Sequence, residues 1–328
     1  MKPVFLHGLW RSGSTYVWSR FRVLSQTYCF YEPLNQGLGR LTLDRIGRDT
    51  EERTENNHHP HMHQPYFAEF APLVFGRGVI NYVRHLAYDD YALKPKQSHT
   101  KLKNYIEGLL EYTKRLGKVP VLGFNRSGLR IAWLKKNFNS CDIYIDRDPI
   151  DIWHSYEQQR NNGNDTFYTA WFETLERNKN NKTLGPLARY IGVRGPLLQF
   201  FTRTKKYYKK HAEKLGPEKR YQLVVYMWAV CLLEGLRYSD IIIDMTQADD
   251  AAYIKQAINS INEATGLEPN FSDIKSIRQP PASLLLRHEA LENEVFALLP
   301  ENSDKTLPEK STLLTPRKQN MLKIALRL

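Results

Sequence analysis

The sequence contains little cysteine. Only three cysteines occur in 328 residues, and none forms a C-x-x-C pair. An odd and sparse set of this kind does not indicate a disulfide-stabilised scaffold. Because Cys29, Cys141 and Cys231 all have apolar neighbours in the sequence, we expect them to fill the core.

Long hydrophobic runs are also lacking. The most apolar stretch, Leu223–Leu236, is too short to cross a bilayer and contains Glu234, so we expect a buried helix there. The first residues do not show the charged segment and long apolar segment of a signal peptide. These two features predict a cytoplasmic protein.

Negative charge is under-represented. Lysine and arginine together number 47, against 35 for aspartate and glutamate, which gives a formal net charge of +12. The excess has two interpretations: a basic surface that aids solubility, or an anionic partner such as a phosphorylated cofactor, an acidic glycan, nucleic acid or a membrane surface. Charge alone does not choose between them.

Short apolar segments alternate with helical patterns along the chain. This order predicts an α/β fold with a central parallel sheet flanked by helices. The expected strands are Pro3–His7, Tyr28–Asn35, Lys118–Asn125, Cys141–Asp148 and Ser239–Met245. The main expected helices are Ser14–Ser25, Val79–Ala87, Leu102–Leu116, Ile131–Phe138, Asp151–Gln159, Leu223–Leu236 and Ala251–Thr265.

No internal repeat or low-complexity linker divides the chain, so we expect a single domain over residues 1–328. Residues 44–65 are polar and are predicted to be a surface insertion. Residues 267–328 show no pattern that assigns them a role.

A glycine-containing loop follows the first expected strand. Gly8 and Gly13 have the spacing of the phosphate-binding loop G-x-x-x-x-G-K-[ST], but Ser14 stands in place of the lysine. A loop between a strand and a helix can bind an anion through backbone N–H groups and the helix dipole. The missing lysine argues against a nucleoside-triphosphatase or kinase. A simple turn with serine caps is the alternative.

Two motifs together resemble a known family. "RSGSTY" (Arg11–Tyr16) resembles the 5′-phosphosulfate loop of sulfotransferases that use 3′-phosphoadenosine-5′-phosphosulfate (PAPS). Arg147 ends an apolar strand and Ser155 follows eight residues later, which resembles the 3′-phosphate motif of the same family. The resemblance covers about Pro3–Tyr156 and the helix–strand unit that ends at Met245.

The resemblance implies a P-loop NTPase-like sulfotransferase fold with PAPS as the donor. The residues at the matching positions would bind PAPS: Arg11, Ser12, Gly13, Ser14, Thr15, Tyr16, Arg147 and Ser155. In some relatives the aromatic at the position of Tyr16 stacks on the adenine. Arg11 would also stabilise charge on the leaving phosphate, and no metal is required.

The same resemblance suggests a catalytic base. Glu32 matches a glutamate that follows the second strand in several carbohydrate and tyrosyl-protein sulfotransferases. The third strand ends in "LGFNRSG", without the histidine of many aryl and steroid enzymes. We therefore expect Glu32 to be the base, with Asn125 and Arg126 near the transferred group. The expected acceptor is a carbohydrate or glycolipid hydroxyl, and a tyrosyl or small-molecule hydroxyl is the alternative.

Two further patterns have less specific interpretations. His58–His63 is rich in histidine but has no carboxylate or cysteine to complete a metal site, so a solvated loop is favoured over acceptor or metal binding. The basic segment Arg203–Lys214 is interpreted as a solvated helix face, with an acidic or membrane-bound acceptor as the alternative. No nucleic-acid partner is expected, and peripheral membrane contact and the oligomeric state stay open.

Two rival functions remain. One is a nucleotide kinase with a degenerate loop, in which Asp244 would serve as a magnesium ligand. The other is a non-catalytic module that binds a nucleotide or nucleic acid.

Overall fold

A five-stranded parallel sheet forms the centre of the computed structural model, which describes residues 2–49, 62, 64–193, 204–275, 288–300 and 311–326. The strands lie in the order β2-β3-β1-β4-β5, and every neighbouring pair is parallel. Their bounds are β1 (Val4–Gly8), β2 (Thr27–Tyr31), β3 (Val119–Phe124), β4 (Cys141–Asp146) and β5 (Ile241–Asp244). All five predicted strands are confirmed.

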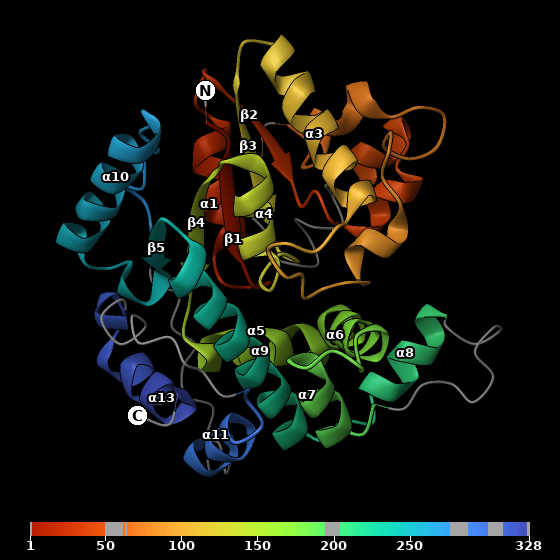
Figure 1. Cartoon of the computed structure of the whole chain (residues 1–328), viewed down its shortest axis with the longest axis vertical. Helices are drawn as coiled ribbons and strands as arrows, with labels where there is room; N and C mark the ends of the chain where they lie inside the picture. The colour runs from red at the N-terminus through yellow and green to blue at the C-terminus, as the bar shows by residue number, and fades with distance from the viewer. Residues whose placement is uncertain are drawn as a thin grey trace.

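Helices surround this sheet (Figure 1). Their bounds are α1 (Ser14–Arg22), α3 (Thr100–Arg115), α4 (Ile131–Phe138), α5 (Pro149–Asn161), α6 (Thr166–Arg177), α7 (Leu184–Tyr190), α8 (Lys205–Ala212), α9 (Pro217–Tyr238), α10 (Ala251–Thr265), α11 (His288–Phe296) and α13 (Pro316–Leu326). The helix predicted at Val79–Ala87 is wrong except for one 3₁₀ turn, Arg84–Ala87. Val79 instead forms an isolated antiparallel bridge with Val74, which places it in extended backbone.

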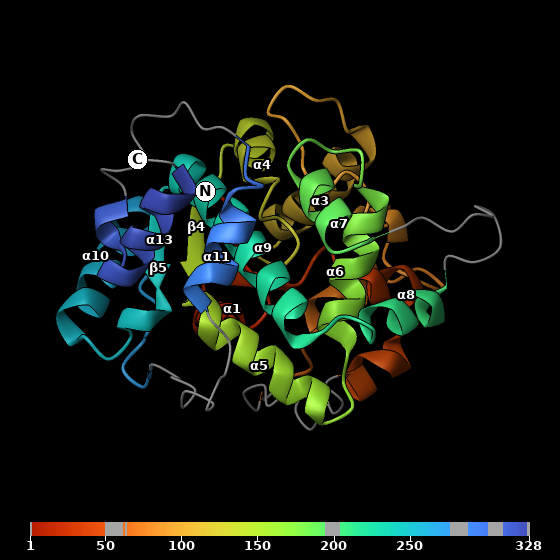
Figure 2. The same cartoon turned by 90° about the horizontal axis from the view of Figure 1, so that it is seen from below.

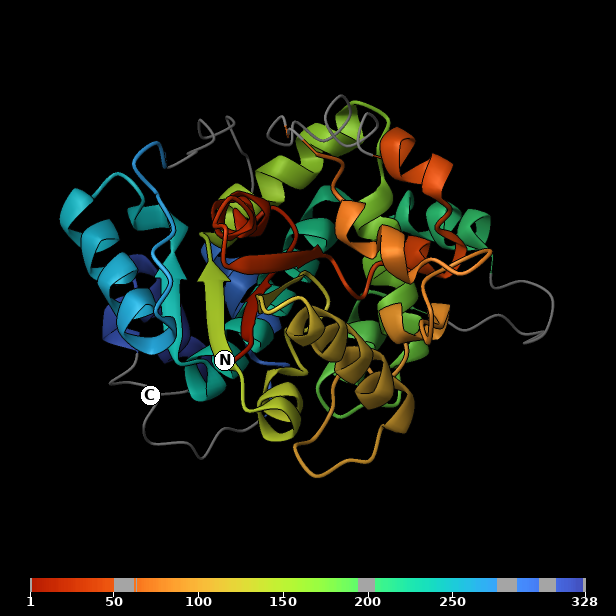
Figure 3. The ribbon, with the colours of Figure 1, turned by 90° about the horizontal axis from the view of Figure 1, so that it is seen from above.

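Helices cover both faces of the sheet, as Figure 3 shows from above. On one face, Trp18 of α1 lies so close to Gly123 that a Cβ at this glycine would be 2.8 Å from the indole. On the other face, Gly235 of α9 leaves room for the ring of Tyr144 on β4. Because side chains alternate along a strand, residues buried on both faces read as continuous apolar runs. Burial on both faces therefore explains why the strands could be predicted from the sequence.

A second helical layer lies at one end of the sheet. It is formed by α5 to α9 (Figures 1 and 2) and has its own apolar core around the buried helix α9. The prediction that Leu223–Leu236 is a buried helix is confirmed. Within the described part of the chain, no helix is both long and apolar enough to cross a bilayer. The three cysteines are buried and unpaired, as expected.

His7 lies in a buried polar cluster that ties the sheet together. Its Nδ1 is 2.7 Å from the hydroxyl of Ser127, and its Nε2 is 2.9 Å from Oδ1 of Asp142. Ser127, His7 and Asp142 thus follow one another as in a hydrolase triad, but with the two ring nitrogens of the histidine exchanged. All three residues have no solvent-exposed surface, so a substrate cannot reach the serine. The cluster is structural, and it joins β1, β4 and the segment after β3.

Candidate functional site

The glycine loop joins the carboxyl end of β1 to the first turn of α1. Gly13 is the N-cap of α1 and has φ 93°, a conformation that favours glycine. At Gly8 a Cβ would lie 2.7 Å from Oγ of Ser12 and 3.0 Å from the carbonyl oxygen of Ile145, so only glycine fits. Since the first N–H groups of a helix have no partner within it, the loop presents donors at this edge of the sheet.

Arg11 has a strained backbone. Its φ is 67°, in the left-handed region that non-glycine residues rarely adopt, and such a conformation costs about 1–3 kcal/mol. Glu32 is also left-handed, with φ 42°. Asparagine and aspartate tolerate this region better than arginine or glutamate do. Strain of this kind often occurs at functional sites, so its presence at both residues supports the interpretation of this edge of the sheet as a site.

The two predicted phosphate motifs meet in the structure. Nε of Arg11 donates a hydrogen bond of 2.7 Å to Oγ of Ser155, and Nη1 of Arg147 donates one of 3.1 Å to the carbonyl oxygen of Arg11. Burial and the positive charge of Arg147 both lower the pKa of Arg11. Burial also lowers the pKa of Arg147, although Asp151 and Asp148 oppose this effect. A bound anion would relieve the repulsion between the two guanidinium groups.

Glu32 is held by three side chains. Nδ2 of Asn125 donates to its Oε1 at 2.8 Å, and Asn35 donates to Oε2. Nη1 of Arg126 lies 3.5 Å from Oε2. Asn125 also accepts a hydrogen bond of 2.8 Å from Oγ of Ser14, so one amide joins the glycine loop to the carboxylate. These contacts fix the carboxylate in place.

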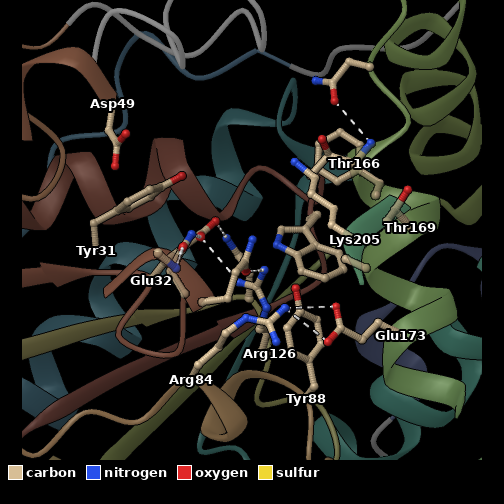
Figure 4. Close-up of a pocket in the computed structure, with 18 of the residues that line it drawn as sticks. Tyr31, Glu32, Asp49, Arg84, Tyr88, Arg126, Thr166, Thr169, Glu173 and Lys205 are labelled. Atoms are coloured by element: carbon tan, nitrogen blue, oxygen red, sulfur yellow. Dashed lines mark hydrogen bonds and ion pairs between the residues drawn. The ribbon is translucent and has the colours of Figure 1, made fainter. Parts of the chain in front are cut away.

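Glu32 and part of the loop open into one cavity of about 1100 Å³. It lies between the carboxyl edge of the sheet and the helical layer, and Figure 4 shows Glu32 and Arg126 near its centre. Among the predicted site residues, Arg11, Ser14, Thr15, Glu32 and Arg126 line the cavity. Ser12, Gly13, Tyr16, Arg147 and Ser155 are not part of this lining, although Arg147 and Ser155 contact Arg11 directly.

Two loop residues have surroundings that the sequence did not indicate. The hydroxyl of Ser12 is buried and has no hydrogen-bond partner among the described residues. The hydroxyl of Tyr16 donates 2.7 Å to Asp273, and its ring packs near Phe271 and under the guanidinium of Arg20. Tyr16 therefore lies toward the segment after α10, away from the cavity lining.

The C-terminal helix contributes a cation that sequence reasoning missed. Nζ of Lys318 on α13 donates to Asp146 at 2.6 Å and to Asp244 at 2.5 Å, at the ends of β4 and β5. All three side chains are almost completely buried. Burial raises the pKa of Asp146 to about 6, although Lys318 opposes this. A lysine in a helix of mixed polarity gives no sequence signal that it will be buried.

The cavity is also lined by residues that were not predicted from the sequence, among them Trp10, Arg84 and Tyr88. The guanidinium of Arg126 stacks 4.6 Å above the ring of Trp10, and Tyr88 lies at the same wall with Arg84 above it at 5.3 Å. Trp10 lies inside the glycine loop, so its position beside the motif was a usable signal. Arg84 comes from the segment wrongly predicted to be a helix, Val79–Ala87, and Tyr88 directly follows it. Nothing local marked either residue.

The histidine-rich segment His58–His63 lies outside the described residues, apart from Met62. Within the described ranges, no group of histidine, cysteine, aspartate and glutamate is arranged to hold a metal ion. The insertion predicted for residues 44–65 is described only in part. Residues 43–49 are helical, and Ile46 packs into the core.

Three comparisons with known proteins identified no relative. No protein-family model, no curated protein and no solved structure matches the chain.

Proposed function

We propose that this protein is a PAPS-dependent sulfotransferase that transfers a sulfuryl group to a hydroxyl of a carbohydrate or glycolipid. The observation that carries the proposal is the direct contact between the two phosphate motifs. Arg11 and Ser155 are 144 residues apart in the sequence, yet they share a hydrogen bond of 2.7 Å. Nothing in the sequence pattern of either motif requires this contact.

The residues at the loop fit an anionic nucleotide with two phosphate-bearing ends. The buried Ser12 hydroxyl, the first N–H groups of α1 and the Arg11 guanidinium provide donors at one end. Arg147 and Ser155 would hold the 3′-phosphate, and this extra contact would distinguish PAPS from ATP. When bound, PAPS supplies an activated sulfuryl group with a phosphate leaving group.

The side chains around the cavity suit in-line group transfer. Glu32 would accept the proton of the acceptor hydroxyl while the new oxygen–sulfur bond forms and the sulfur–oxygen bond to the leaving phosphate breaks. Arg11 would stabilise the negative charge on that phosphate. Asn125 would fix Glu32 relative to the loop, because it bonds to both Ser14 and Glu32.

The kinase alternative is less well supported. Ser14 stands where a phosphate-binding loop has its lysine. Asp244, the candidate magnesium ligand, is already paired with the ammonium group of Lys318 at 2.5 Å. A magnesium ion at this carboxylate would have to displace a buried charge.

Part of the proposal rests on the family resemblance. This is the case for the P-loop NTPase-like sulfotransferase identity of the fold. The single-domain organisation and the cytoplasmic location are also proposed, and they rest on the composition and patterning of the sequence. A tyrosyl or small-molecule acceptor is the second candidate, since a carboxylate base serves any hydroxyl. The non-catalytic alternative predicts ligand binding without transfer.

Calorimetric titration with 3′,5′-adenosine bisphosphate (PAP), ADP and ATP tests the proposal. We expect the wild-type protein to prefer PAP strongly in the absence of magnesium, and Arg147→Ala to lose this preference. Arg115→Ala, at an exposed arginine at the end of α3, is the matched control. Equal or tighter binding of ATP would overturn the proposal and favour the kinase.

A further inference from the structure

The cavity extends well beyond the residues assigned to the donor. Its lining also includes Arg40, Arg84, Tyr88 and residues of α6 and α8. Figure 4 shows Arg84, Tyr88 and Glu173 together near Arg126. Its volume of about 1100 Å³ is slightly above the range for small-ligand sites, which is about 300–1,000 Å³. A donor nucleotide and part of an acceptor therefore fit in it together.

The lining is strongly biased toward positive charge. Six cationic residues face three carboxylates. The cations are Arg11, Arg40, Arg45, Arg84, Arg126 and Lys205, and the carboxylates are Glu32, Asp49 and Glu173. Even if every carboxylate pairs with one cation, three positive charges remain in one concave site, where low-dielectric walls strengthen their effect.

Arg84 is placed to contact an acceptor. Its Nη2 lies 3.2 Å from Glu173, and 46% of its side chain is exposed. Glu173 is buried and already accepts shorter contacts from Arg177, at 2.9 and 3.0 Å. Arg177, which also donates 2.8 Å to Asp89, therefore shares the charge of Glu173 with Arg84. The Nε and Nη1 groups of Arg84 make no hydrogen bond to the described residues, so they are available to a ligand.

Aromatic and neutral polar groups complete the wall. Trp10 and Phe167 form a tilted ring pair with centroids 6.1 Å apart at the cavity. Hydroxyl and amide side chains of Asn162, Asn164, Thr166 and Thr169 lie beside them. Only 6% of Trp10 is exposed and Arg126 covers its ring, so the half-buried Phe167 is the ring that can contact a ligand. A flat ring next to neutral hydrogen-bonding groups suits a sugar, which has an apolar face and a rim of hydroxyls.

We propose that the acceptor is an anionic glycan, carrying carboxylate or sulfate groups close to the reacting hydroxyl, and that Arg84 is a specificity-determining residue for that charge. This inference rests on the proposed sulfotransferase function. Arg84 would recognise the negative charge of this acceptor. An arginine can bind a carboxylate or sulfate in a bidentate manner, which Lys205 in the same lining cannot.

Matched oligosaccharides test the charge requirement. The probes are hexasaccharides of unsulfated chondroitin and of heparosan, which carry uronate carboxylates, and their carboxyl-reduced forms, which have the same linkages without charge. Affinity is measured by calorimetry with PAP present, and transfer is measured with ³⁵S-labelled PAPS. We expect the anionic forms to bind at least about tenfold more tightly than the reduced forms, the effect of one charge-assisted hydrogen bond.

Variants of Arg84 test whether this residue causes the preference for anionic glycans. Arg84→Gln should reduce the preference for the anionic forms about tenfold. Arg115→Gln, the exposed arginine outside the cavity, should leave it unchanged. Arg84→Lys should restore only part of the preference, because lysine keeps the charge but loses the planar fork.

The donor titration separates the two proposals. Preferential PAP binding with no difference between anionic and reduced glycans, or with no glycan binding at all, overturns the acceptor inference alone. Tighter binding of a single-stranded oligonucleotide than of every glycan also overturns it. Failure to bind PAP preferentially overturns the proposed function itself.

Discussion

Arg317 forms an ion pair with Asp148, the residue that follows Arg147, which is predicted to bind the 3′-phosphate. Its Nη1 donates to both carboxylate oxygens of Asp148, each at 2.8 Å. The next residue, Lys318, binds Asp146 on the other side of Arg147. Two consecutive residues of α13 thus bracket Arg147 through its two neighbours. The C-terminal helix is therefore a positioning element for the candidate donor site.

Replacing Arg317 should weaken recognition of the 3′-phosphate. In Arg317→Ala, Asp148 still caps α5 through its hydrogen bond of 2.9 Å to the N–H of Ile150, so the fold should persist. We expect PAP to bind about tenfold more weakly, whereas adenosine 5′-phosphosulfate, which has no 3′-phosphate, should bind as before. Calorimetry with both ligands measures the difference.

Lys323 provides the control for this experiment. It is an exposed cation on the same helix, so Lys323→Ala changes the charge of α13 without touching the contacts of Arg147. An equal loss of affinity for both ligands in Arg317→Ala would mean that the helix only stabilises the fold. Unchanged PAP binding would mean that Arg147 does not depend on α13.

Glu32 carries the proposed proton transfer, and its removal should affect turnover more than binding. Glu32→Gln should bind PAP normally and lose transfer activity by about a hundredfold or more. The NH₂ group of the glutamine would face the donating Nδ2 of Asn125 or of Asn35, so two donors would meet and could destabilise the fold. Thermal unfolding must therefore first show that the variant is folded. Glu111→Gln, at an exposed glutamate of α3, is the control. Full activity of Glu32→Gln would exclude Glu32 as the base.

The strands and the glycine loop could be predicted because they depend on local patterns. β1 and β4 are buried over their whole length and are mostly apolar, since both faces of a parallel sheet are covered; their polar residues, such as His7 and Asp142, pair inside the core. The loop is recognisable because Gly8 and Gly13 meet steric requirements that only glycine satisfies. Glu32 and Arg147 could be placed at one sheet edge because the carboxyl ends of parallel strands meet there.

The rest depends on contacts between distant segments. Lys318 is buried because two carboxylates at strand ends accept its charge, and neither carboxylate is near it in the sequence. Arg84 faces the cavity because the chain around it is extended and ends in a single 3₁₀ turn. The local periodicity of Val79–Ala87 suggested a helix, and tertiary packing overrode it.

Asn125 should control the protonation of Glu32. In Asn125→Asp, a second carboxylate would replace the amide that now donates 2.8 Å to Oε1 of Glu32. The like charge would raise the pKa of Glu32, so the carboxylate form needed for catalysis would appear only at higher pH. We expect the acidic limb of the kcat profile to move up by about one pH unit or more. Asn139→Asp, at an exposed left-handed position, should leave the profile unchanged.

An unchanged profile in Asn125→Asp would mean that Glu32 is not the base in the rate-limiting step. A lower rate at every pH, without a shift, would assign Asn125 a purely geometric role. The two results are distinguishable because only the electrostatic effect depends on pH.

Asp146 should make the stability of the protein depend on pH in a defined window. Burial raises its pKa from 3.8 to about 6 in the folded state. Between these values the folded protein binds more protons at this site than the unfolded chain does. The contribution of Asp146 to the free energy of unfolding therefore falls as the pH rises from about 4 to about 6, by up to about 3 kcal/mol.

Denaturant unfolding at a series of pH values measures this effect in wild type and in Asp146→Asn. The variant should lack the fall, so the stability of the wild type relative to the variant should decrease across the window. Lys318 retains Asp244 as a partner in the variant, which keeps its buried ammonium paired. Asp44→Asn removes an exposed carboxylate and serves as the control. If the wild type and Asp146→Asn give parallel curves, Asp146 is ionised throughout and Lys318 outweighs the effect of burial.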